Sequence, residues 1–271
     1  TYSGIGENKK VTEIPQMIHI NGAKIAVWSY AHFLNDDFND KDSSWVCIFN
    51  VDDAIKKIKT WRDSADVTLV TFHGGEEYKN KPLSKHVEAF YQLLEAGAMA
   101  IIGSHPHVPQ PIEIYKTSDE RETVIFYSLG NFVANQSRKY RHPSSPVEYG
   151  DTRDALIASF NLNLVDYGPL GKKWEIHDAG AIPCWIKNNY HEYLKKDDKK
   201  KSKGNYKSNN VTMKREIQVV SIFDEIEKID IGLDTLIRRI ELKKANRADS
   251  LTVKNLIKDK RHYLNRIKRV E

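Results

Sequence analysis

Three histidines occupy corresponding places in the sequence, each just beyond an apolar run. His73 follows the run "LVTF", and His105 and His107 lie on either side of Pro106, shortly after the run "AII". Neutral imidazole is a good ligand for zinc, iron and manganese, so three such groups around one point would hold a divalent ion. A single loop histidine is more often a hydrogen-bonded polar residue. The metal interpretation therefore depends on the elements that place the three.

Two parallel strands would bring these histidines to one edge of a sheet. Residues 66–72 and 98–103 are nearly continuous apolar runs, typical of strands buried on both faces. Between them, residues 84–97 repeat apolar side chains at helical spacing and end at a glycine. A strand–helix–strand order predicts parallel pairing. Neighbouring strands lie about 5 Å apart, and their carboxyl ends form the functional edge, so we expect the histidine loops to converge there.

The flanking segments add further elements on either side of this unit. Residues 23–30 predict a strand, and residues 51–62 predict a helix with Asn50 as its N-cap. Beyond Pro106, the runs "PIEIY", "TVIFYSL", "ALIASFNLNLV" and "KWEIHDAGAI" indicate short strands, which we interpret as antiparallel additions. Residues 213–246 and 250–269 have apolar stripes at helical spacing, which we interpret as packing surfaces.

The composition of the chain limits which kinds of protein and which kinds of metal site are possible. The chain is long enough to bury a sizeable core, and its apolar and charged fractions exclude wholesale disorder. The basic run at 195–207 reads best as a solvated linker, and without a nucleic-acid motif we expect no nucleic-acid partner. Cys47 and Cys184 permit one bridge at most and are too few for a cysteine-built zinc site. A metal would depend on His, Asp, Glu or Asn.

Several motifs resemble those of the CapA family, which is associated with poly-γ-glutamate capsule synthesis. They are "HGGEEY", "GSHPHVPQPIEIY" and "VIFYSLGNF", with "GIGEN…EIP…INGAKIAV" near the start, and the likeness runs from residue 4 to residue 165. The resemblance implies an α/β fold of the calcineurin-like metallophosphoesterase type, a layered αββα sandwich that is incomplete at its N-terminus and has a helical C-terminal extension. The expected divisions are that domain at 1–190, a Lys-rich linker at 191–210 and the helical extension at 211–271.

The resemblance also implies a ligand set for one or two divalent ions of Mn, Fe or Zn. His73 and His105 would hold one ion, and His107 would hold its neighbour. The chain departs from the family pattern at Gly74, where tryptophan is usual, and at Ser104, where a further histidine is common. Both positions adjoin the ligands, so these departures affect substrate contacts more than metal binding.

Glu77 and Asn131 are the candidate catalytic residues. Glu77, a possible proton carrier, and Tyr78 match the family pattern "HWGxEY", while Asn131 matches "YSLGNF". Each also has a simpler interpretation. Glu77 would be a surface charge, Tyr78 a packing residue, and Asn131 a turn former.

The family's N-terminal ligand segments, a "GD" strand end and a later "NNH", have no equivalent in the right place. Gly150-Asp151 comes after the histidine motifs, and Asn209-Asn210 falls in the Lys-rich linker. A two-metal phosphoesterase needs a bridging carboxylate to hold ions about 3.5–4 Å apart, whereas three histidines build a single open site. We expect the missing portion to be a separate polypeptide, to have been cleaved away, or to lie outside this sequence.

Three functions are consistent with these observations. The favoured one is a metal-dependent hydrolase acting on a phosphoester or on an amide of the polymer, outside the cytoplasm in the cell envelope. Its partners would be an anionic polymer, capsule synthase membrane components and a companion chain carrying the N-terminal part. The alternative is a non-catalytic polymer-binding or scaffold component of the capsule synthesis complex. An N-terminal nucleophile hydrolase using Thr1 ranks last, because no motif supports it.

Overall fold

The computed structural model divides the chain into two compact units, which are described separately. It describes residues 3–34, 46–192, 214–241 and 247–270. Unit 1 comprises Thr1–Gly130 and Ile157–Ala181, and unit 2 comprises Asn131–Leu156 and Ile182–Glu271. Thr1, the candidate N-terminal nucleophile, lies outside the described residues, and so does the Lys-rich linker apart from its first two positions.

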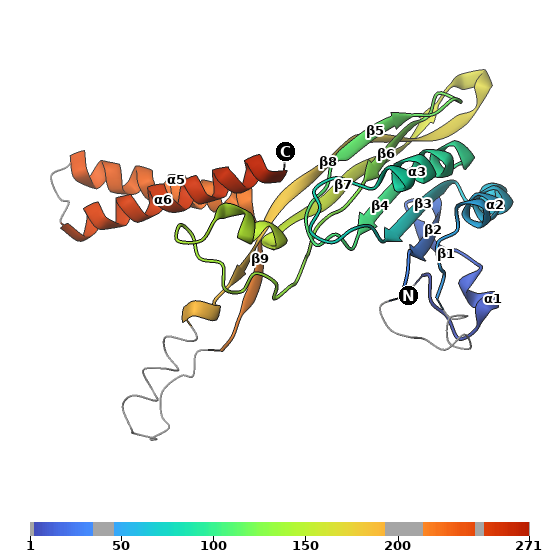
Figure 1. Ribbon diagram of the computed structural model, residues 1–271. Helices are drawn as coiled ribbons and strands as arrows, with labels where there is room; N and C mark the ends of the chain where they lie inside the picture. The colour runs from blue at the N-terminus through green and yellow to red at the C-terminus, as the bar shows by residue number, and fades with distance from the viewer. Residues whose placement is uncertain (1–2, 35–45, 193–213, 242–246, 271) are drawn as a thin grey trace. The chain divides into compact units, whose positions relative to one another are not determined.

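Unit 1 is built on a six-stranded mixed sheet of order β1-β2-β3-β4-β6-β5 (Figure 1). The strands are β1 (Gln16–Ile20), β2 (Ala23–Ala31), β3 (Val67–His73), β4 (Ala100–Ser104), β5 (Ile112–Lys116) and β6 (Glu122–Phe126). The predicted parallel pairing of β3 with β4 is confirmed, and β2 pairs parallel with β3. The predicted antiparallel additions are confirmed in part: β5, at the sheet edge, pairs antiparallel with β6, but β6 joins β4 in parallel, so the prediction is wrong for that pair.

Helices cover one face of this sheet (Figure 1). They are α2 (Val51–Trp61) and α3 (Ser84–Ala96), with the short helices α1 (Lys9–Thr12) and η2 (Arg62–Ser64) nearby in the chain. The predicted N-cap of α2 is confirmed, since Asn50 Oδ1 accepts from the backbone N–H of Asp53 at 3.0 Å. Gly97, with φ at +128°, ends α3. The core on this face includes Trp28, Phe90 and Ile101.

A long strand pair covers the other face of the sheet. It consists of β7 (Asp154–Asp166) and β8 (Lys172–Asn188), joined through η4 (Gly168–Leu170). Phe160, Trp174 and Ile176 from this pair belong to one apolar cluster with Val67 and Phe126 of the sheet. Unit 1 therefore has helix, sheet and sheet layers, a mixed α/β arrangement as predicted.

Unit 2 combines strand ends with two long helices. Its elements include η3 (Val147–Arg153), β9 (Ile217–Ser221), α5 (Ile222–Glu241) and α6 (Arg247–Val270). The predicted helix over 213–246 is wrong at its start, because residues 217–221 pair antiparallel with β8 instead. The apolar stripes are confirmed as packing surfaces, since Ile222, Ile229 and Leu256 share a cluster with Trp185. Neither these nor the other described helices are long and apolar enough to span a bilayer.

Candidate metal centre

Strand register places the histidines at one edge of the unit 1 sheet. His73 is the last residue of β3 and aligns with Ser104, the last residue of β4, so His105 begins the adjacent loop. Backbone hydrogen bonds join the two loops: Gly74 N–H donates to the Ser104 carbonyl at 3.0 Å, and Tyr78 N–H donates to the Pro106 carbonyl at 2.8 Å. The loops that carry the histidines are therefore tied together by backbone as well as by side chains.

The structure brings the three imidazoles together. Ring centroids of His73 and His105 lie 5.0 Å apart, and those of His105 and His107 lie 5.9 Å apart. His105 is only 7% exposed, whereas His73 is exposed. The cluster thus has a buried inner member and a side that is open to solvent.

Electrostatics keep the imidazoles in the form that binds metals. Burial is the main cause that lowers the pKa of His73 and His105, and the neighbouring His107 lowers both further. The carboxylate of Glu77 opposes the effect at His105. Both rings are therefore neutral at neutral pH, with a lone pair available to a cation.

Ser104 orients the ring of His73. Its hydroxyl oxygen lies 3.0 Å from Nδ1 of His73 and donates to the carbonyl oxygen of Phe72 at 3.4 Å. With its proton used in that way, the hydroxyl accepts from Nδ1–H, which leaves Nε2 of His73 with the lone pair. A hydrogen bond to the other ring nitrogen, as here, fixes the tautomer of metal-binding histidines. The residue that departs from the family pattern thus positions a candidate ligand.

Backbone strain concentrates in the same loops. His105, His107 and Tyr78 have φ values of +100°, +60° and +62°, a region that non-glycine residues rarely adopt. Such conformations cost on the order of 1–3 kcal/mol each and cluster at functional sites. The ring of Tyr78 stacks on that of His107 with centroids 5.9 Å apart, so Tyr78 packs against a candidate ligand although its own side chain is exposed.

The two candidate catalytic residues differ in their placement. Glu77 lies beside the histidines, with Oε1 at 3.8 Å from Nε2 of His107. Asn131 belongs to unit 2, where its Nδ2 donates to Gln136 Oε1 at 2.9 Å and to the Thr152 carbonyl at 2.8 Å. The amide of Asn131 is thus held by residues of its own unit, and unit 1 gathers only Glu77 with the histidines.

Sequence reasoning missed His32 and His86. His32 directly follows β2, so three neighbouring parallel strands each end at or next to a histidine, and its backbone N–H donates to the His73 carbonyl at 2.8 Å. Its ring meets that of His86, with centroids 4.7 Å apart. Among the described residues, the buried Nδ1 of His32 and Nε2 of His86 have no hydrogen-bond partner. The signal was present in "AVWSYAH", an apolar strand followed by histidine.

Gly74 makes room for His32. A Cβ atom at position 74 would lie 2.4 Å from the His32 Cβ and 2.7 Å from the Phe72 Cζ, far inside van der Waals contact. The tryptophan usual at this place in the family is incompatible with this packing of His32. In this chain, glycine at position 74 is therefore required by the placement of His32.

The donor set fits a borderline transition-metal ion, since neutral imidazoles suit Zn, Fe and similar metals. Within the described ranges, however, no group of three or more His, Cys, Asp or Glu side chains is arranged so that it could hold a metal ion. Asp151, one sequence candidate for a carboxylate, is paired with Arg266 and Arg269 in unit 2. Cys47 and Cys184 are buried free thiols.

Comparisons with known proteins place the first half of the chain in a family. Residues 1–136 match the model described as "Bacterial capsule synthesis protein PGA_cap". The chain is 33% identical to "Capsule biosynthesis protein CapA" of Bacillus anthracis, over 62% of this chain and 41% of that protein. It is 35% identical to "PGA biosynthesis protein CapA" of Bacillus subtilis (strain 168), over 60% and 40% respectively. The chain thus spans about two fifths of the length of these relatives.

Among solved structures, a putative 5′-nucleotidase from Staphylococcus aureus in complex with alpha-ketoglutarate shows only a limited likeness. It is 13% identical with a TM-score of 0.40, and the match covers 67% of this chain and 32% of that one.

Proposed function

Because the chain belongs to the PGA_cap family of bacterial capsule synthesis proteins, we propose that it serves in the synthesis of poly-γ-glutamate or a related cell-envelope polymer. We further propose that it acts there as a divalent-metal-dependent hydrolase. The observation that carries this proposal is the group of imidazoles of His73, His105 and His107 at the carboxyl ends of two parallel strands. Two relatives, named as a capsule biosynthesis protein and a PGA biosynthesis protein, support the polymer and a location in the cell envelope.

The proposed ligands divide between two neighbouring positions. His73 and His105 would hold one ion of Mn, Fe or Zn, and His107 would hold a second where further ligands complete the site. Such an ion would supply Lewis acidity toward a phosphoester or an amide. We propose that the remaining ligands come from a companion chain or a further part of the protein, and that membrane components of the capsule synthase are partners.

Other residues of the chain would orient the histidine rings and protonate the leaving group. Ser104 holds the His73 ring, and Tyr78 supports the His107 ring from one face. Glu77 is exposed, with its carboxylate close to His107, and this position beside the cluster is the basis for proposing it as the proton carrier. His105, buried beneath, would keep water from the inner side of the cluster.

Metal analysis tests this proposal most simply. We expect purified protein to retain a divalent transition metal and to hydrolyse p-nitrophenyl phosphate or a γ-glutamyl peptide. The double variant His73→Ala, His107→Ala should lose both the metal and the activity. His19→Ala, an exposed histidine on β1, is the matched control and should change neither. Metal content that is unaffected by the double variant would overturn the assignment of the ligands.

A non-catalytic role is the second candidate, favoured by the incomplete ligand set among the described residues. The protein would then bind the anionic polymer or act as a scaffold. Polymer binding by protein that retains no metal, with no hydrolysis of either substrate, would support this role over the first.

A further inference from the structure

Arg153 is a buried cation at the point where η3 leads into β7 in unit 2. Its side chain is 7% exposed, and burial is the main cause that lowers its pKa to about 10. Nε donates to the Ile186 carbonyl at 2.7 Å, and the guanidinium lies 4.4 Å from the centre of the Trp185 ring. Burying a charge is energetically costly unless the charge is paired, so the terminal nitrogens of Arg153 are expected to have a partner of opposite charge.

The neighbouring Arg266 is a buried guanidinium that is fully paired, and it provides a comparison for Arg153. Arg266 is 0% exposed and also lies over Trp185, at 5.0 Å from its ring centre. Its nitrogens donate to Asp154 and Asp151, and Asp151 is shared with Arg269. Three guanidinium groups therefore meet two carboxylates. In the part of the chain that the structure describes, the terminal nitrogens of Arg153 have no hydrogen-bond or carboxylate partner.

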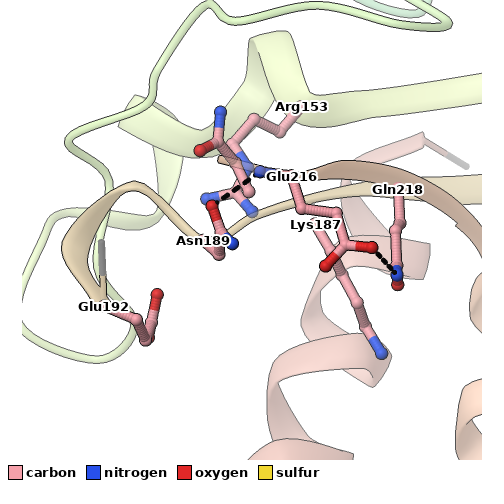
Figure 2. A pocket seen from close by; sticks show the side chains of 7 residues that line it. Arg153, Lys187, Asn189, Glu192, Glu216 and Gln218 are labelled. Carbon is pink, nitrogen blue, oxygen red and sulfur yellow. Dashed lines mark hydrogen bonds between the residues drawn. The ribbon is translucent and has the colours of Figure 1, made fainter. Parts of the chain in front are cut away.

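A pocket of about 300 Å³ opens at Arg153, and all of its lining residues belong to unit 2 (Figure 2). This volume is at the lower end of the range for small-molecule sites, enough for a ligand of amino-acid size. Figure 2 shows Arg153, Asn189, Glu216 and Gln218 among the side chains that line the pocket, with the carboxylate of Glu216 turned toward Gln218. Glu192 also lines the pocket, so carboxylates are present as well as the cation.

Several other polar side chains that line the pocket form hydrogen bonds within unit 2. Asn189 Oδ1 accepts from the Glu216 N–H at 2.9 Å, and Gln218 Nε2 donates to Glu216 Oε1 at 3.1 Å. Asn188 Nδ2 donates to Asn135 Oδ1 at 3.1 Å. Lys187 also lines the pocket, and its ammonium group is paired with Glu225. These hydrogen bonds fix the wall in advance. A carboxylate can accept further hydrogen bonds, so the guanidinium of Arg153 and the carboxylates of Glu216 and Glu192 are the charged groups that can meet a ligand.

We infer that this pocket binds the head of an α-amino acid, with the carboxylate on Arg153 and the ammonium group toward Glu216 and Glu192. A planar guanidinium matches a carboxylate in a two-point fork. The two acidic side chains attract an ammonium group and repel a multiply charged anion such as phosphate. The mixed charge of the pocket therefore selects a zwitterion over a simple anion.

This inference rests on the proposed function for the identity of the ligand. In a γ-linked glutamate polymer, each internal unit keeps its α-carboxylate but has its nitrogen in an amide bond. Only the unit at the amino end keeps both an α-ammonium and an α-carboxylate. The pocket would therefore recognise the amino end of the polymer, and free glutamate presents the same head.

Calorimetric titration of the whole protein tests the inference with four probes: glutamate, γ-glutamylglutamate, N-acetyl-γ-glutamylglutamate and inorganic phosphate. We expect the dipeptide to bind. The acetylated form should bind more weakly by roughly ten- to a hundredfold, the equivalent of one charged hydrogen bond, and phosphate should not compete. Binding of glutamate without the dipeptide would overturn recognition of the polymer end. Equal binding of the acetylated form would overturn the zwitterion.

Variants locate the binding. Arg153→Gln should abolish it, whereas Arg138→Gln, an exposed arginine of the same unit, should leave it unchanged. Because Arg153 packs on Trp185, Glu216→Gln provides a second test that leaves the core intact. It should remove the preference for the free amine over the acetylated dipeptide. Unchanged binding and selectivity in Glu216→Gln and Arg153→Gln would overturn the site. The His73→Ala, His107→Ala variant should bind normally, which separates this result from any failure of the proposed metal site.

Discussion

The histidine cluster of unit 1 and the arginine–aspartate cluster of unit 2 are both polar groups packed among aromatic rings, but their neighbours differ. Arg266 meets groups of opposite charge, two aspartates, together with the carbonyl oxygen of Val147. His73 and His105 instead meet other imidazoles, in loops with strained backbone. A cluster in which opposite charges pair with one another stabilises the fold. A cluster of neighbouring imidazoles, which do not pair in this way, is better suited to binding a ligand such as a cation. Arg153 is the member of the unit 2 cluster that follows the second pattern.

The largest expected effect comes from breaking the satisfied cluster. Arg266→Ala leaves the buried Asp154 without its ionic partner beside the half-buried Asp151, which should lower the free energy of unfolding of unit 2 by about 3–5 kcal/mol. Urea denaturation followed by circular dichroism at helix wavelengths measures it. Arg269→Ala, partly exposed, should cost about 1 kcal/mol or less. Equal losses in the two variants would show that burial of the pair does not matter.

Gly74→Ala tests the packing around the histidine cluster. The new Cβ would meet His32 and Phe72, which should lower the free energy of unfolding by about 1–3 kcal/mol through overpacking. Gly180→Ala, where a Cβ meets nothing within 4 Å, is the matched control in the same unit. If thermal unfolding places both variants at the same stability, His32 does not occupy the position described.

Acid should destabilise unit 2 through His262. Burial, as the main cause, lowers the pKa of this ring to about 3 from its ordinary 6.5. The unfolded chain therefore takes up a proton below pH 6.5 while the folded ring stays neutral. The contribution of the neutral His262 ring to the free energy of unfolding is therefore retained above pH 6.5. Below that pH the free energy of unfolding falls by about 1.4 kcal/mol per pH unit, or about 2 kcal/mol by pH 5.

Replacing the ring isolates this effect. His262→Phe keeps an aromatic side chain and removes the titrating group, so the fall in unfolding free energy between pH 6.5 and pH 5 should become shallower. Denaturant titrations at both pH values measure the difference. An identical pH dependence in the variant and the unmodified protein would exclude His262 as its source.

The smallest effect expected is on the metal rather than on the fold. Ser104→Ala removes the hydroxyl that orients His73, and should weaken zinc binding by roughly tenfold with little change in stability. Competition with a chromophoric chelator measures the affinity. Ser118→Ala, at an exposed serine of the same unit, is the control. No change in affinity would mean that Ser104 does not orient a ligand.

The local sequence pattern was sufficient to predict the helices and strands whose formation depends mainly on neighbouring residues. The helix after Asn50 and the strands that end near His73 and His105 follow from capping and from apolar runs. Pairing with distant segments could not be predicted in the same way. β6 pairs in parallel with β4 while β5 takes the sheet edge, and residues 217–221 form a strand that pairs with β8.

The candidate site was predictable to the same extent. His73, His105 and His107 could be proposed because each follows a recognisable strand, and Glu77 because it lies in the same loop. His32 was overlooked although it follows β2 in the same way. The burial of Arg153 could not be predicted from the sequence, since its partners Ile186 and Trp185 lie more than thirty residues away.

Cobalt titration tests the central claim, that the imidazoles of unit 1 form a site for a divalent ion. Added Co²⁺ should give visible absorption bands that saturate at a defined stoichiometry, because imidazole ligation in a low-symmetry site makes these transitions intense. The bands should be retained in His19→Ala and lost in His73→Ala, His107→Ala. Absence of any bands, or bands that are unchanged in the double variant, would contradict the account.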